Sequence, residues 1–345
     1  DALPISVQTP RFFYLIPAQT RGRLDGESFG RHMKRLLFSG KRQLPSGGVK
    51  IIYQHCELLR QHGIVATPVH MADFIVDWFP HQVPHLTLKQ AQDEIGPDDV
   101  LVCPEVIPAA AASFTNRHKI AFIQNWAFAA VGTGADRRFE DFAMSGLLAC
   151  SNYIRDYMQE RSDLDCAVIT NGIDLEIFKP PLPGGTRSRI IYQNRRNVAD
   201  ARRALELLDP ALRARHDFFE MANNYPQAEM VRFFQEADIY LAIGYPEGFA
   251  LPPLEAMACG CAVVGFTGGG GLEHMLDGET ALVAPDGDAR ALADGLTRLL
   301  TDDALKEQLR AGGLRKAAEY PLARMERELL AWAGSFGAVP QGKSS

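Results

Sequence analysis

The stretch GYPEGFALPPLEAMACGCAVVGFTGGGG, residues 244–271, decides the fold expected for this chain. It follows the apolar run ADIYLAI at residues 237–243, which is typical of a buried strand, and its opening Gly and Pro residues indicate a loop. Pro252 and Pro253 suit the first helical positions, and Gly260 suits the position just past a helix end. The stretch therefore predicts a strand, a loop and a short helix in that order.

Two glutamates fall within this stretch, Glu247 in the predicted loop and Glu255 in the first helical turn. Free N–H groups and the positive end of the helix dipole favour an anionic group there, either a bound phosphate or a hydroxyl-binding carboxylate. A second strand at residues 262–266 ends in Thr267 and the glycines 268–271. Adjacent turns at the carboxyl ends of parallel strands bind ligands, and glycine lets backbone amides approach a diphosphate or a sugar ring. Without a ligand, Glu255 would be a helix-dipole carboxylate, Glu247 a solvated loop charge and the glycines a plain turn.

The amino-acid composition limits the classes of protein to which this chain can belong. A chain of 345 residues with 46% hydrophobic and 23% charged residues can build two ordinary domains. The net charge of −6 argues against a protein that binds nucleic acid through phosphate contacts. The six cysteines form no C-x-x-C pair and have no zinc-type spacing, which indicates reduced, buried thiols. No run of 18 apolar residues occurs and no signal peptide is recognised, so the chain is expected to be cytoplasmic.

Strands and helices alternate along both halves of the chain, which predicts parallel sheets with helices on both faces, an α/β fold of two doubly wound, Rossmann-like domains. In the first half the predicted strands are residues 12–16, 65–69, 99–103, 119–124, 146–150 and 167–170. In the second half they are residues 189–193, 218–221, 239–243, 263–266 and 281–284.

The domain boundary is predicted from composition. Residues 179–188, rich in Pro and Gly, are expected to link a first domain, residues 1–178, to a second domain, residues 189–320. A closing helix at about residues 321–340 carries an apolar pattern and is expected to pack back on the first domain.

Several motifs together resemble those of a known family. Glu247, Glu255, Ala256-Met257-Ala258 and Gly260 match the E-x7-E and A-M-A-x-G pattern of the retaining, nucleotide-sugar-dependent glycosyltransferases of the GT-B fold, family 4. Further landmarks of that family follow in order along the chain: Gly47-Gly48, DVLVCPE from Asp99, CSNYIRDYM from Cys150, ITNGIDLEIFKP from Ile169 and GETALVAPDGD from Gly278. The ordered set covers most of the chain and is far more specific than one motif.

The resemblance implies a cleft between the domains, with the donor on the second domain and the acceptor on the first. It places Glu255 on the ribose hydroxyls and Glu247, as a catalytic residue, on the transferred sugar. The remaining donor-binding positions that it implies are Gly248, Phe249, Ala250, Leu251, Gly47, Gly48, Thr267, Gly268 and Gly269.

The sequence departs from the family pattern at the cationic residues that are expected near the donor diphosphate. The family usually has an Arg, then a Lys five residues later, after the first strand of the second domain; here Arg195 matches the Arg, but Asp200 stands at the Lys position. We expect Arg195 to act in catalysis and either Arg196, from a different register, or Arg202 or Arg203, from the next helix turn, to replace the lysine. A solvated pair of arginines is the plainer alternative.

A second departure concerns the first domain. Gln124 and Asn125 occupy the place of the usual family histidine, so a neutral amide, with Asn125 counted among the catalytic residues, would bond the sugar. The front-face mechanism usually assigned to this family uses the leaving phosphate to take the acceptor proton and needs no dedicated base. The remaining histidines considered, His70, His81, His85, His118 and His274, are expected on the surface or in packing.

A long insertion, residues 17–45, separates the first strand from the Gly47-Gly48 turn. Between Arg21 and Arg42 it is basic and carries a partial apolar stripe, so it could contact a membrane surface or an anionic acceptor. A helix that packs its stripe on the protein's own core is the simpler interpretation.

Taken together, these patterns predict a retaining glycosyltransferase that moves a hexose-type sugar from a nucleotide-sugar donor to a carbohydrate or lipid-linked acceptor. No cofactor and no metal are expected. A UDP-sugar epimerase of the same fold and a non-catalytic nucleotide-sugar binding protein are the alternatives. A nicotinamide-dependent dehydrogenase is disfavoured because Pro17-Ala18-Gln19, and no G-x-G-x-x-G motif, follows the first strand.

Overall fold

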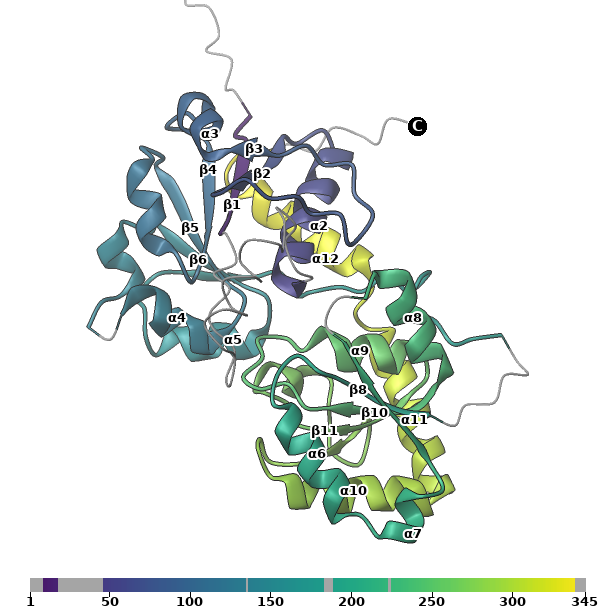
Figure 1. The fold of residues 1–345 in the computed structure, drawn as a ribbon. Helices are drawn as coiled ribbons and strands as arrows, with labels where there is room; N and C mark the ends of the chain where they lie inside the picture. The colour runs from purple at the N-terminus through teal and green to yellow at the C-terminus, as the bar shows by residue number, and fades with distance from the viewer. Residues whose placement is uncertain (1–8, 18–45, 135, 183–188, 223–224, 339–345) are drawn as a thin grey trace, which may run out of the picture.

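The computed structural model describes residues 9–17, 46–134, 136–182, 189–222 and 225–338. These residues form two α/β domains, each built on a parallel sheet (Figure 1). The first sheet has the strand order β3-β2-β1-β4-β5-β6-β7, and the second has the order β12-β11-β10-β8-β9. The basic segment between Arg21 and Arg42 lies outside the described residues.

The strands of the first sheet are β1 (Phe12–Ile16), β2 (Ala66–His70), β3 (Leu86–Thr87), β4 (Val100–Pro104), β5 (His118–Ile123), β6 (Gly146–Ala149) and β7 (Cys166–Val168). Those of the second sheet are β8 (Arg189–Gln193), β9 (Asp217–Met221), β10 (Ala237–Ala242), β11 (Ala262–Gly265) and β12 (Leu282–Val283). Every predicted strand is present with ends shifted by at most one or two residues, and the short β3 is the strand that the pattern missed.

Helices cover both sheets. In the first domain they are α2 (Gly47–Gln61), α3 (Leu88–Glu94), η1 (Pro108–Ser113), α4 (Trp126–Thr133), η2 (Phe139–Phe142) and α5 (Asn152–Gln159). In the second domain they are α6 (Val198–Leu207), α7 (Pro210–Arg213), α8 (Gln227–Glu236), α9 (Leu251–Ala258), η3 (Gly270–Glu273), α10 (Ala289–Thr301) and α11 (Asp303–Ala317), and α12 (Leu322–Gly334) closes the chain.

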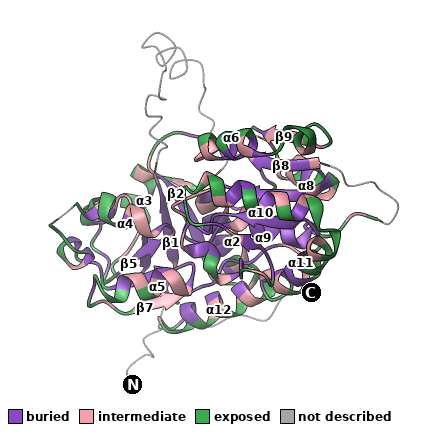
Figure 2. Ribbon diagram, turned by 90° about the horizontal axis from the view of Figure 1, so that it is seen from below, coloured by how far each residue is buried: buried purple, intermediate pink, exposed green. Residues whose placement is uncertain are grey.

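The central strands form because most of their side chains are apolar. All five residues of β1, FFYLI, are buried, as expected for a central strand covered on both faces. Figure 2 shows buried residues along the sheets and inner helix faces, with exposed residues on the outer helix faces. One buried cluster runs through the first domain and continues into the second, where Phe178 meets Phe234 with ring centroids 6.4 Å apart.

The closing helix α12 lies beside α2 in the first domain (Figure 1). Pro321 bridges to Ile173 just before the helix begins, and Trp332 packs on Phe12 with ring centroids 5.5 Å apart. The helix ends at Gly334, earlier than the predicted range of about 321–340, and a turn follows in which Gly337 has a positive φ of 86°. The chain thus returns to the first domain after completing the second.

The strand order of the second sheet indicates which edge of the sheet is suited to bind a ligand. The chain runs outward in opposite directions on either side of β8 and β10, so the sheet has a topological switch point between these strands. The loops after β8 and β10 leave from the same edge because the two strands are parallel. The segments that carry Arg195 and Glu247 therefore meet there.

Candidate functional site

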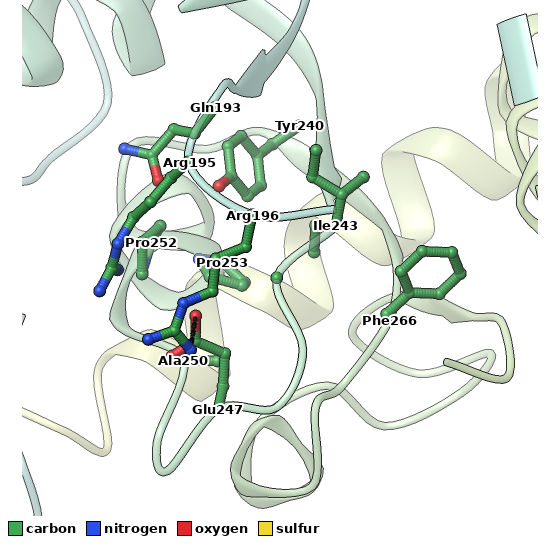
Figure 3. Close-up of a pocket in the computed structure, with 12 residues that line it drawn as sticks. Gln193, Arg195, Arg196, Tyr240, Ile243, Glu247, Ala250, Pro252, Pro253 and Phe266 are labelled. Carbon is green, nitrogen blue, oxygen red and sulfur yellow. Dashed lines mark ion pairs between the residues drawn. The ribbon is translucent and has the colours of Figure 1, made fainter. Parts of the chain in front are cut away.

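A pocket lies at this switch point (Figure 3). The loop after β8, the loop after β10 and the start of α9 all contribute to its wall. Its lining residues are Gln193, Arg195, Arg196, Tyr240, Ala242, Ile243, Gly244, Glu247, Ala250, Pro252, Pro253 and Phe266. The predicted catalytic residues Arg195 and Glu247 are thus brought to one pocket.

The start of α9 presents unpaired backbone donors. Ala250 precedes the helix with φ 59° and ψ 64°, a left-handed conformation that is rare for a residue other than glycine. Within the described ranges, no acceptor is found for the N–H groups of Gly248, Phe249, Ala250 and Leu251. Because Pro252 follows without an N–H group, these amides are the donors that an anion at the helix start would meet.

Glu247 is held by backbone bonds to the glycine loop. Its N–H donates to the carbonyl oxygen of Gly268 at 2.8 Å, and its own carbonyl accepts from the N–H of Gly270 at 3.0 Å. Its carboxylate lies 3.6 Å from the Arg196 guanidinium, and both side chains are mostly buried, with 18% and 25% exposed. The loop thus fixes the backbone of Glu247, while Arg196 balances its charge.

The glycine loop itself is a support. Gly268 donates to the Asp286 carboxylate at 3.1 Å and Gly269 to the Thr267 hydroxyl at 3.4 Å. Gly270 donates to the carbonyl oxygen of Glu247 and Gly271 to that of Thr267, so the N–H groups of all four glycines are used within the protein. The predicted donor-binding roles of Thr267, Gly268 and Gly269 remain predictions, and the bonds seen here serve to brace Glu247.

The four arginines that could bind a diphosphate differ in the partners they have in the structure. Arg202 makes two bonds to Glu220, at 2.8 and 3.1 Å, and Arg203 pairs with Glu206 at 3.1 Å, so both point to their own carboxylates. Arg196 donates to the carbonyl oxygen of Pro246 at 2.6 Å, as well as facing Glu247. Burial lowers its pKa, which the nearby Glu247 partly offsets.

Arg195 differs from these neighbours. It is exposed, lines the pocket, and has no carboxylate partner among the described residues (Figure 3). Asp200, which stands at the usual lysine position, accepts a bond from the Tyr245 hydroxyl at 2.8 Å. Arg195 is therefore the cation of this pocket that is available to a phosphate.

Glu255 is paired across the domains, a contact that sequence reasoning missed. Lys50, in the first turn of α2, places Nζ 3.3 Å from Oε1 of Glu255. The two side chains are only 15% and 12% exposed. The sequence signal that could have pointed to Lys50 is its closeness to the predicted Gly47-Gly48 turn. Its pairing with a residue 205 positions away leaves no local sequence pattern.

Gly47 and Gly48, which were predicted as a turn, are the first two residues of α2. The Cβ position of Gly47 lies 3.8 Å from Leu251 Cδ1 in the second domain, and that of Gly48 lies 3.0 Å from Gln124 Oε1 in the first. Gln124 has no hydrogen-bond partner for its amide in the part of the chain that is described. Gly47 therefore borders the start of α9, and the Gln124 amide lies beside Gly48.

Both ends of the Asn125 side-chain amide form hydrogen bonds within the protein. Its Oδ1 accepts from the N–H of Ala127 and caps α4, and its Nδ2 donates to the carbonyl oxygen of Pro246 at 2.9 Å. Glu105 in turn accepts from the Asn125 N–H at 3.0 Å, and burial raises the pKa of Glu105 to about 7. The predicted sugar contact of Asn125 stays a prediction, and in this conformation Gln124 has the less committed amide.

Further bonds join the two domains around the pocket. Trp126 donates from Nε1 to the carbonyl oxygen of Gly268 at 3.0 Å, and Ser151 donates to that of Gly248 at 2.7 Å. Glu273 accepts from the N–H of Tyr153, at the start of α5, at 3.1 Å. Sequence reasoning did not select these residues, although Ser151 and Tyr153 lie in the CSNYIRDYM motif.

No histidine lines the pocket. His274 is fully buried between the rings of Phe249 and Tyr320, and burial lowers its pKa to about 3. His70 stacks on His85 at 3.9 Å, with its pKa lowered to about 4 chiefly by burial. His81 is partly buried, and His118 is exposed.

Other predictions concern cysteines, metals and membranes. None of the six cysteines, all of which are described, forms a disulfide, and five of them are buried. Across the described ranges, no group of three or more His, Cys, Asp or Glu side chains could hold a metal ion. Likewise, no described helix has the length and apolar character needed to cross a membrane.

Comparison with known proteins assigns the second domain. Residues 206–316, which include Glu247 and Glu255, match the family "Glycosyl transferases group 1". D-inositol 3-phosphate glycosyltransferase of Corynebacterium diphtheriae is 34% identical over 104 residues, 30% of this chain and 24% of that protein. Phosphatidyl-myo-inositol mannosyltransferase of Mycobacterium leprae is 39% identical over 88 residues, 25% of this chain and 23% of that protein.

The longest of these matches is to the D-inositol 3-phosphate glycosyltransferase of Frankia alni, 26% identical over 208 residues, 47% of this chain and 51% of that protein. The chain thus spans about a quarter to a half of the length of the curated relatives it matches. The family match agrees with the predicted enzyme class, a glycosyltransferase.

Solved structures identify the fold as GT-B. Sucrose-phosphate synthase from Thermosynechococcus elongatus superposes with a TM-score of 0.67 over 95% of this chain and 100% of that chain, at 14% identity. The Anabaena protein HepE, in complex with UDP-glucose, also has a TM-score of 0.67, covering 94% of this chain and 99% of that one at 14% identity. The predicted pair of Rossmann-like domains is confirmed.

Proposed function

We propose that this protein is a retaining, metal-independent glycosyltransferase that moves a hexose-type sugar from a nucleotide-sugar donor to a carbohydrate or lipid-linked acceptor. The observation that carries the proposal is one pocket that combines Glu247, Arg195 and Ala250. Among the described residues, Arg195 has no carboxylate partner and the Ala250 N–H, at the start of α9, has no acceptor. Glu255 and the edge of the first domain lie beside the pocket.

The reaction breaks the bond between the anomeric carbon and the β-phosphate oxygen, and negative charge develops on that oxygen. Fixed N–H dipoles and a cation stabilise such charge best when they need no rearrangement. The amides of Phe249, Ala250 and Leu251 are fixed by the helix and by the proline pair that follows, and Arg195 supplies the cation. Glu255 would accept the ribose hydroxyls, and Glu247 would orient the transferred sugar.

Retention follows if the acceptor attacks from the face that the phosphate leaves. The acceptor oxygen forms the new bond to the anomeric carbon, and its proton passes to the leaving phosphate oxygen. This route asks no protein side chain for a proton, which is consistent with a pocket that no histidine lines. The amide of Gln124 and the glycines that begin α2, Gly47 and Gly48, would border the sugar from the first domain.

The proposed class of acceptors is broad. Two relatives are named for inositol 3-phosphate and phosphatidyl-myo-inositol, so inositol phosphates belong in the acceptor panel. A role in polysaccharide or glycoconjugate biosynthesis, in the cytoplasm and at the inner face of the membrane through the segment from Arg21 to Arg42, completes the proposal. Vesicle flotation with anionic lipids tests the membrane part separately.

The experiment incubates the protein with UDP-, GDP-, ADP- and dTDP-hexoses and a panel of sugar, inositol phosphate and lipid acceptors. Mass spectrometry identifies the product, and the anomeric configuration is read by NMR. Transfer with retention, unaffected by EDTA and lost in Glu255→Ala but not in the exposed control Glu279→Gln, would support the proposal. Inversion or loss of activity in EDTA would contradict it, and a changed donor without acceptor would identify an epimerase. Binding without any turnover would identify a binding protein.

A further inference from the structure

We propose that Lys50 is a donor-site positioning residue supplied by the first domain, which holds Glu255 ready for the nucleotide and couples nucleotide binding to contact between the domains. The inference rests on the proposed function of the pocket. The contact that carries it is the ion pair between Lys50 Nζ and Glu255 Oε1 at 3.3 Å.

The surroundings of Lys50 place it at the junction of the two domains. It belongs to the first turn of α2, two residues after Gly48. Its Nζ also lies 5.2 Å from the ring centroid of Phe178, which packs against Phe234 of the second domain. A desolvated ammonium gains from such a ring, so Lys50 is held from both sides.

Charge balance explains why Glu255 needs this partner. A carboxylate on a side chain that is only 12% exposed is costly to bury without a counter-charge. Glu247 has Arg196 of its own domain, whereas Glu255 has Lys50 of the other domain. Each glutamate of the pocket region is thus neutralised, which reduces the repulsion that an approaching diphosphate would meet.

The geometry leaves Glu255 able to accept a ligand. Lys50 contacts Oε1, and no donor to Oε2 is found among the described residues. An ionised carboxylate can accept several hydrogen bonds, so ribose hydroxyls can bind without displacing Lys50. The nucleotide would then bind to a carboxylate already oriented by the first domain, and separation of the domains would weaken binding.

The test measures nucleotide affinity by calorimetry with UDP, GDP, ADP and dTDP as probes. For the nucleotide that the wild type binds best, Lys50→Met should raise Kd at least about tenfold, and Lys50→Arg should stay within about threefold. Lys50→Met combined with Glu255→Gln should bind no more weakly than Glu255→Gln alone, because the two residues act as one unit. Lys179→Met, which removes an exposed lysine near the domain junction, should leave Kd unchanged.

A second readout separates positioning from folding. Small-angle X-ray scattering should show that the nucleotide compacts the wild type but not Lys50→Met, while thermal unfolding confirms that both are folded. Equal or tighter binding by Lys50→Met would overturn the inference, and tighter binding would show that Lys50 is instead displaced by the nucleotide. If the wild type binds none of the four nucleotides, the proposed function fails first, and the Lys50 inference fails with it.

Discussion

Asn125 of the first domain donates from Nδ2 to the carbonyl oxygen of Pro246 in the second domain at 2.9 Å. Pro246 immediately precedes Glu247, and its carbonyl oxygen also accepts from Arg196 at 2.6 Å. One backbone oxygen thus gathers a donor from each domain next to the glutamate of the pocket. The position of Glu247 therefore depends on contact between the domains.

Replacing Asn125 tests this dependence. Ser retains a side-chain oxygen that can cap α4 but has no donor that reaches Pro246, whereas Ala loses both. We expect Asn125→Ser to keep the stability of the wild type while lowering kcat/KM for transfer about tenfold. Asn125→Ala should also lose about 1 kcal/mol of unfolding free energy. Urea unfolding and the transfer assay measure the two effects, and unchanged kcat/KM in Asn125→Ser would show that the bond is dispensable.

Arg195 should matter for turnover and hardly at all for stability. It has no carboxylate partner in the described part of the chain, so Arg195→Ala should change the unfolding free energy by no more than about 0.5 kcal/mol. Loss of a cation that stabilises the leaving phosphate should lower kcat by about 10²-fold or more. The matched control is Arg203→Ala, since Arg203 is exposed and pairs with Glu206. A variant with normal kcat would remove Arg195 from the proposed mechanism.

Gly248 should tolerate no side chain. A Cβ atom at Gly248 would lie 1.9 Å from the carbonyl oxygen of Gln124, across the domain boundary, so Gly248→Ala must push the domains apart. We expect transfer activity to fall by about two orders of magnitude, since a displacement of about 1 Å can have that effect. Gly334→Ala is the control, because nothing lies within 4 Å of its Cβ position. Crystal structures or scattering profiles of the two variants would reveal whether Gly248→Ala opens the cleft.

Stability should fall in acid because of two buried histidines. Burial lowers the pKa of His55 and of His274 to about 3, below the value of about 6.5 expected in the unfolded chain. The unfolded chain therefore binds more protons below about pH 6.5, and each histidine lowers the unfolding free energy by about 1.4 kcal/mol per pH unit down to its folded pKa.

The measurement is urea unfolding between pH 7 and pH 5. His55→Leu has no imidazole ring to protonate. Its unfolding free energy should therefore depend on pH less steeply than that of the wild type, by the contribution of one buried histidine. The control variant is His118→Gln, which replaces an exposed histidine. Equal slopes in the wild type and in His55→Leu would mean that His55 titrates alike in both states.

Local patterns predicted most of the architecture. The strands were found because apolar runs such as FFYLI must be buried on both faces. The start of α9 was found because Pro252 and Pro253 suit the first helical turn, and Gly260, with φ of 81°, follows its end as expected. β3 escaped detection because two residues carry no periodic signal.

The roles of individual polar residues were less predictable. Asn125 and Gln124 are neighbours in the sequence, yet one caps a helix and reaches Pro246 while the other keeps its amide available. Arg195 and Arg196 are likewise adjacent, yet Arg195 has no carboxylate partner among the residues that the structure describes, whereas Arg196 contacts Glu247 and Pro246. Which of two neighbouring side chains faces a site depends on backbone direction, and composition does not carry that information.

The sequence by itself determined the two parallel sheets and the strand, loop and helix order around the pocket, because burial and turn chemistry act within a few residues. Only the tertiary structure decided that Lys50 meets Glu255 and that Ser151 meets Gly248, pairs separated by 205 and 97 positions. It also decided that the glycine loop braces Glu247 through the carbonyl oxygen of Gly268 and the N–H of Gly270. Such contacts arise when two separately folded domains are brought face to face, and no local pattern specifies which side chains then lie opposite one another.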